Sequence, residues 1–140
     1  MIQKENIVMK EKVGNWEEAI RLSAQPLIDN GYIEESYVEA IFENTEKNGP
    51  YYVLAPEIAM PHASPQAGVK EAQISLLVMK EPIYFSKDGF PVRLVFTLAA
   101  VDETSHLTSL QKLANVFADE ALIQKIIDAQ DVDEVCKLIA

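Results

Sequence analysis

Two histidines are the residues of this chain best suited to chemistry, and each follows a predicted strand. His62 comes after the apolar run Ile58-Ala59-Met60 and one proline, and His106 stands in the first turn of a predicted helix. Imidazole titrates near neutral pH without any perturbation, so its neutral nitrogen can act as a nucleophile, a base or a ligand. Each residue alone could equally be structural, as a capped histidine at a strand end or a helix residue that faces water.

The two histidines are predicted to lie at the same edge of a sheet. Each stands where a strand gives way to a loop, and ligand sites in open α/β sheets favour that edge. If the two strands are neighbours, the imidazoles of His62 and His106 converge although they are far apart in the sequence. We therefore take His62 as the first candidate for a site residue and His106 as its candidate partner.

Other common chemistries lack the residues that they need. A zinc site usually takes three or four ligands, and although Asp102 and Glu103 could join His106, no His-x-x-x-His spacing is present. The sequence also has no Gly-x-Ser-x-Gly nucleophile elbow and no glycine-rich phosphate loop. Cys136 lies in a predicted buried helix, where a thiol is more often part of the core. We expect no metal and no cofactor.

The remaining chemistry is a histidine that carries a phosphoryl group covalently. One imidazole nitrogen attacks the phosphorus, while the other is held by a hydrogen bond that selects the tautomer. The charge on the phosphoryl oxygens needs nearby donors. These could be a ring nitrogen of His106, backbone N–H groups after His62 and the N–H groups at the helix start, residues 105–107.

Composition limits the class of protein. A chain of 140 residues is predicted to form a single domain over 1–140. It has one cysteine, no apolar run long enough to cross a bilayer and no signal-peptide pattern at its start, which together predict a cytoplasmic protein without membrane insertion. The net charge of −10 argues against nucleic acid as a partner and suits either solubility or a basic partner face.

Strands are predicted in the middle of the chain, with helices before and after them. The longest strand, 92–101, is nearly all apolar after Arg93 and is predicted to lie mid-sheet with both faces covered. The pattern as a whole predicts an α/β layered domain. The other strands are expected at 7–9, 51–54, 58–60 and 73–79, the last continued by an extended segment at 81–85, and the helices at 16–28, 35–47, 105–118, 120–129 and 133–139.

The run Ile58-Ala59-Met60-Pro61-His62 resembles the phosphorylation-site motif of the IIA proteins of the bacterial sugar phosphotransferase system, mannitol/fructose family. The longer strings 48–63 and 99–106 are more similar to the ascorbate-type branch, and the likeness covers almost the whole chain. The resemblance implies an EIIA type-2 domain with a mixed central sheet of about five strands and helices on both faces.

The resemblance also implies a cycle of phosphoryl transfer. His62 would accept a phosphoryl group on Nε2 from the carrier protein HPr and pass it to a cysteine of a IIB component, while His106 assists without being phosphorylated. The membrane IIC component would couple this transfer to uptake of L-ascorbate or a related sugar. The alternatives are a IIA for fructose, mannitol or another polyol, and a regulatory nitrogen-type IIA that binds non-transport partners. The sequence leaves open whether the chain forms a homodimer.

One departure from the family bears on charge. Mannitol-type members carry an arginine between the second helix and the histidine motif, whereas residues 43–49 of this chain contain none. His106, backbone donors or Lys47 would then have to meet the phosphoryl charge. The missing arginine favours the ascorbate type over the mannitol type.

Overall fold

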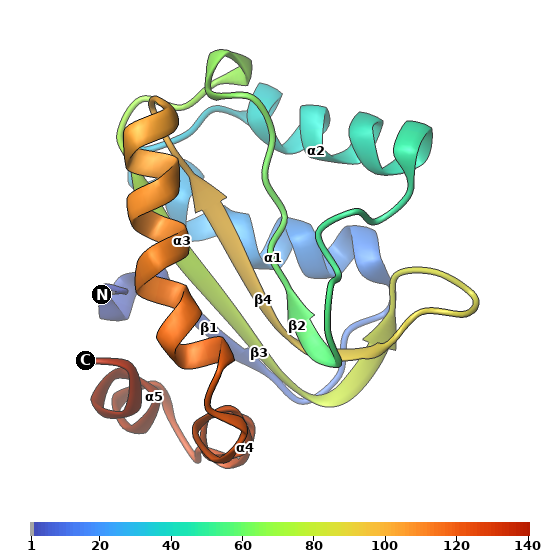
Figure 1. Ribbon diagram of the computed structural model, residues 1–140, viewed down its shortest axis with the longest axis vertical. Coiled ribbons are helices and arrows are strands. Elements are labelled where there is room, and N and C mark those ends of the chain that lie inside the picture. The colour runs from blue at the N-terminus through green and yellow to red at the C-terminus, as the bar shows by residue number, and fades with distance from the viewer. Residues whose placement is uncertain (1) are drawn as a thin grey trace.

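A four-stranded sheet with helices on both faces forms the centre of the computed structural model, which describes residues 2–140 (Figure 1). The strand order is β1-β3-β4-β2, with β1 parallel to β3, β2 parallel to β4, and β3 antiparallel to β4. The predicted mixed sheet is therefore confirmed, with four strands in place of about five. The strands are β1 (Ile7–Lys10), β2 (Glu57–Ala59), β3 (Gln73–Tyr84) and β4 (Pro91–Ala99).

Helices cover the sheet because neighbouring residues of β3 and β4 point to opposite faces and both faces are apolar. Leu77 and Val95 pack with α1 and α2 on one face, whereas Leu76 and Phe96 pack with α3, α4 and α5 on the other (Figure 1). The helices are α1 (Trp16–Asp29), α2 (Glu35–Asn48), α3 (Glu103–Phe117), α4 (Glu120–Asp128) and α5 (Val132–Ile139), with short 3₁₀ turns at Lys4–Asn6 and Pro65–Ala67.

The predicted strand at 51–54 is wrong, because this segment forms a turn. The N–H groups of Tyr51 and Val53 donate to the carbonyls of Gly49 and Pro50, at 2.9 and 3.1 Å. Gly49 turns the chain after α2 with φ of 78°, a conformation that glycine adopts without strain. The apolar run reflects the burial of Tyr52, which is 1% exposed, rather than pairing in a sheet.

The two long strands differ from their predicted lengths. β3 continues without a break through the segment predicted only as extended, and its 12 residues make it longer than β4, which has 9. The prediction that 92–101 is the longest strand is therefore wrong. Its predicted place is confirmed, since β4 lies between β3 and β2 and is buried from Leu94 to Ala99.

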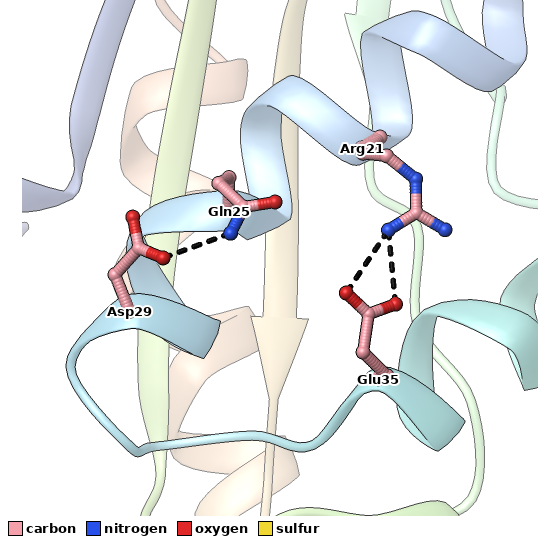
Figure 2. Close-up of polar contacts among 4 residues, drawn as sticks. All are labelled: Arg21, Gln25, Asp29 and Glu35. Carbon is pink, nitrogen blue, oxygen red and sulfur yellow. Dashed lines mark hydrogen bonds and ion pairs between the residues drawn. The ribbon is translucent and has the colours of Figure 1, made fainter.

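Polar contacts on the surface link α1 to α2. Arg21 donates to both carboxylate oxygens of Glu35, at 3.2 and 2.9 Å, and Gln25 donates to Asp29 one turn further along α1, at 2.8 Å (Figure 2). Exposed ion pairs of this kind contribute about 0–1 kcal/mol. The apolar cluster under α1 and α2 therefore holds these helices in place.

Candidate functional site

His62 and His106 lie side by side at one edge of the sheet. β2 and β4 are parallel neighbours, so the chain leaves both strands at the same edge, and the N–H of Leu98 donates to the carbonyl of Pro61 at 3.0 Å. The centroids of the two imidazole rings are 5.2 Å apart, with 52° between the ring planes. The predicted convergence of the two rings is confirmed.

A hydrogen bond fixes the tautomer of His62. Its Nδ1 lies 2.8 Å from the carbonyl oxygen of Met60, which can only accept, so Nδ1 carries the hydrogen and Nε2 keeps a free lone pair. Burial lowers the pKa of His62, the bond to Met60 opposes this shift, and the nearby His106 lowers the pKa further. The ring is therefore neutral at physiological pH, with Nε2 as its nucleophilic atom.

The His62 ring opens into a hollow of about 400 Å³ at the strand exits. Within residues 2–140, no lysine or arginine lines this hollow. Lys47, a candidate to meet the phosphoryl charge, is exposed on α2 and does not reach it. The lining residues are Asn44, Tyr51, His62, Ala63, Ser64, Pro65, Ala100, Asp102, Glu103 and His106.

Tyr37 of α2 joins the two chain segments that carry the histidines. Its Oη donates to the carbonyl of Leu98 at 2.5 Å and accepts from the N–H of Ala63 at 3.1 Å. Burial raises the pKa of Tyr37 to about 12, so the hydroxyl keeps its proton. The N–H directly after His62, one of the expected donors for a phosphoryl group, is therefore already engaged.

The start of α3 holds His106 through a capping box. The N–H of Ser105 donates to Asp102 Oδ1 at 2.7 Å, the N–H of Asp102 donates to Ser105 Oγ at 3.2 Å, and the N–H of His106 donates to the Asp102 carbonyl at 3.1 Å. These bonds to Ser105 lower the pKa of Asp102. Helix α3 begins at Glu103, earlier than predicted. The N–H groups of Ser105 and His106 were expected to be free donors, but both are engaged in hydrogen bonds.

Sequence reasoning missed several residues that line the hollow, among them Tyr51 and Asn44. Tyr51 Oη donates to the carbonyl of His62 at 2.5 Å, and the tyrosine and imidazole rings meet edge to face with centroids 5.5 Å apart. The signal that could have indicated Tyr51 is a pair of tyrosines directly after a Gly-Pro turn. Asn44 lies on a helix whose pattern gives no such signal.

Two further findings concern residues 2–140. They contain no group of three or more histidine, cysteine, aspartate or glutamate side chains arranged to hold a metal ion. None of their helices has the length and apolar character needed to span a bilayer.

Comparison with known proteins identifies close relatives. The profile of the family described as phosphoenolpyruvate-dependent sugar phosphotransferase system, EIIA 2, matches residues 1–140. The mannitol-specific cryptic phosphotransferase enzyme IIA component of Escherichia coli K12 is 36% identical over 126 residues, which cover 90% of this chain and 86% of the relative. The ascorbate-specific EIIA component of the same strain is 33% identical over 141 residues, covering 99% and 92%.

A solved complex contains a chain of the same fold. It joins the mannitol enzyme IIA of Escherichia coli to the phosphorylated mannitol enzyme IIB. Its matching chain superposes with a TM-score of 0.85 at 29% identity, covering 99% of this chain and 96% of that one.

Proposed function

Since the chain belongs to the EIIA 2 family of the phosphoenolpyruvate-dependent sugar phosphotransferase system, we propose that His62 is the residue on which it carries the phosphoryl group. One observation supports this above all. The Met60 carbonyl holds Nδ1 of His62, so the lone pair of Nε2 is available at a hollow shared with the second imidazole. His106 then assists from 5.2 Å without being phosphorylated.

The transfer needs no proton to leave His62. Nε2 attacks the phosphorus of a phosphohistidine on the donor, the N–P bond of the donor breaks, and its electron pair returns to the donor imidazole. The hydrogen stays on Nδ1 and keeps its hydrogen bond to the Met60 carbonyl. This bond stabilises the positive charge that develops on the ring. In the second step a cysteine thiolate of the acceptor attacks the phosphorus, and the electron pair of the Nε2–P bond returns to His62.

In this proposal, donors other than lysine and arginine meet the phosphoryl charge. The hollow offers the Asn44 amide and a ring nitrogen of His106, whereas the Ser64 hydroxyl already donates to Gln66 Oε1. The Asp102 carboxylate accepts from the N–H of Ser105 at the start of α3. Within residues 2–140, no guanidinium or ammonium group lines the hollow to stabilise the phosphoryl oxygens further. The phosphorylated state is thus expected to be reactive rather than strongly stabilised.

The partners follow from the family. HPr is the proposed donor and a IIB component the proposed acceptor, as in the similar complex of IIA with phosphorylated IIB. Through IIB the chain would serve a membrane IIC permease, and it would work in the cytoplasm. The net charge of −10 suits basic faces on the proteins that it meets.

The proposed sugar is L-ascorbate or a related sugar, because the ascorbate-specific relative matches 99% of the chain. A polyol such as mannitol is the second candidate, since the mannitol-specific relative is 36% identical over a shorter stretch. Phosphoryl transfer to a panel of IIB proteins separates the two. The IIB that accepts the group fastest identifies the sugar.

Transfer from phospho-HPr tests the role of His62. Intact-mass measurement should show one added phosphoryl group, labile in acid and stable in alkali. His62→Ala should abolish the addition, whereas His106→Ala should slow it and leave the final extent unchanged. Wild-type labelling of the His62 variant, or an acid-stable product, would refute the assignment.

A further inference from the structure

Tyr51 contacts His62 at two places, and the transfer chemistry so far makes no use of it. Its Oη donates to the His62 carbonyl at 2.5 Å, and its ring meets the imidazole edge to face, with centroids 5.5 Å apart and 89° between the planes. A side chain that holds both the backbone and the ring of one residue limits its translation and its rotation together. Supporting contacts of this kind hold a functional side chain in its productive geometry.

Tyr51 is itself anchored to α2. Its ring packs on the ring of Tyr52, with centroids 5.0 Å apart. Tyr52 Oη lies 2.7 Å from Thr45 Oγ1, and Thr45 donates in turn to the carbonyl of Ile41 at 2.7 Å. Tyr52 and Thr45 are 1% and 5% exposed, so the anchor belongs to the close-packed core.

The Tyr51 hydroxyl is a dependable donor. Burial raises the pKa of Tyr51, and a hydrogen bond with the Asn44 side chain only partly opposes the shift. The phenol therefore keeps its proton throughout the neutral range. The other titratable groups that line the hollow are His62, His106, Asp102 and Glu103.

We propose that Tyr51 is a positioning residue for His62. Its hydroxyl fixes the backbone from which the imidazole projects, and its ring closes one side of the imidazole, so that Nε2 stays directed toward the incoming phosphoryl group. This inference rests on the proposed role of His62 as the acceptor. It assigns Tyr51 no contact with the phosphoryl group itself.

Two substitutions separate the two contacts. Tyr51→Phe removes the hydrogen bond and keeps the ring, whereas Tyr51→Leu removes both. Tyr84→Phe is the matched control, because Tyr84 is 57% exposed at the end of β3 and does not line the hollow. Thermal unfolding of all three variants checks that each one folds.

Single-turnover uptake from phospho-HPr is the first measurement. In Tyr51→Phe the rate constant at saturating HPr should fall about five- to tenfold, the loss expected for one orienting hydrogen bond, with unchanged half-saturation. Tyr51→Leu should be slower still, and Tyr84→Phe should match wild type. Wild-type rates in both Tyr51 variants would overturn the proposal. So would weaker half-saturation at an unchanged rate constant, because it would make Tyr51 a docking contact.

A titration of the His62 ring by nitrogen NMR is the second measurement, and it needs no partner. Loss of the Tyr51 ring in Tyr51→Leu lets water reach the imidazole, so the pKa of His62 should rise toward its ordinary value. In Tyr51→Phe, which keeps the ring, the pKa should stay at the wild-type value. An unchanged pKa in Tyr51→Leu would overturn the proposal. Failure of wild-type protein to take up a phosphoryl group would instead refute the function proposed for His62.

Discussion

Replacing Tyr37 by phenylalanine should loosen the edge of the sheet that carries both histidines. Tyr37 is 1% exposed. Its hydroxyl donates to the Leu98 carbonyl and accepts from the Ala63 N–H. Phenylalanine fills the same space, so no cavity forms and the packing of the ring is kept. The substitution removes the Tyr37 hydroxyl. Within residues 2–140, this is the only polar group of α2 that bonds both to the chain after β2 and to the end of β4.

The size of the effect follows from the two groups left behind. A buried polar group without a partner costs about 1–3 kcal/mol, and less where water can reach it. The Leu98 carbonyl is buried and the Ala63 N–H is only partly so, which together give a loss of about 2 kcal/mol in the free energy of unfolding. Unfolding entropy for 140 residues is about 0.3 kcal/mol per kelvin, so the melting temperature should fall by about 7 °C.

Urea unfolding of three tyrosine variants provides the assay. Tyr52→Phe should lose about 1 kcal/mol, because the Thr45 hydroxyl keeps its bond to the Ile41 carbonyl. Tyr84→Phe should lose nothing measurable, since that ring is exposed. The predicted order of destabilisation is Tyr37, Tyr52, Tyr84, with slower phosphoryl uptake for Tyr37→Phe. If Tyr37→Phe were as stable as Tyr84→Phe, the reasoning about the shared hydroxyl would be refuted.

Two further predictions concern pH and the start of α3. Because burial lowers the pKa of His62, uptake measured in single turnover should stay constant as pH falls from about 8 to about 6.5, and decline only below. The lowered pKa also means that His62 binds a proton more readily in the unfolded chain than in the folded protein. Its contribution to the free energy of unfolding is therefore complete above about pH 6.5, the pKa in the unfolded chain, and is lost as the pH falls toward the lower pKa of the folded state. His62→Gln should remove this part of the pH–stability curve, and an unaltered curve would contradict it. Asp102→Ala should lower the melting temperature and slow uptake by freeing the start of α3, while Asp102→Asn should preserve both, because its amide oxygen still accepts from Ser105; equal behaviour of the two variants would count against the cap.

Periodicity in the sequence was enough to predict most elements and to place both histidines at strand exits. Apolar residues at helical spacing marked α1, α2 and α4 to within one or two residues, and the apolar run of β4 indicated a strand covered on both faces. The rings of His62 and His106 could be brought together because parallel neighbouring strands end at the same edge of a sheet. Local pattern carries the strand ends, but the sequence left open whether the two strands are neighbours, and the structure shows that they are.

Some contacts that complete the site depend on tertiary structure and could not be predicted from the sequence. The Tyr37 hydroxyl reaches residues 26 and 61 positions away, and nothing in its own helix indicates either partner. The segment 51–54 has the composition of a strand, yet it buries one ring through a turn. At the start of α3, the sequence predicts free N–H donors, whereas in the structure the N–H of Ser105 donates to Asp102 in the capping box. The Tyr37 contacts are long-range, whereas the turn and the capping box are local, and their residues, Gly49-Pro50 and Asp102-x-x-Ser105, stand in the sequence.

Within residues 2–140, the lack of lysine and arginine at the hollow fits the work of a carrier. A phosphoryl group brings a charge of about −2, and within residues 2–140 it would meet His106 and the Asn44 amide, with the side chains of Asp102 and Glu103 nearby. Strong neutralisation would stabilise the phosphorylated ground state, and any interaction stronger there than in the transition state slows the onward step. A site whose geometry is fixed by Met60, Tyr37 and Tyr51 can instead orient Nε2 without binding the product tightly. We expect positioning to carry most of the catalysis here, which makes the hydroxyl groups around His62 more informative targets than an introduced arginine.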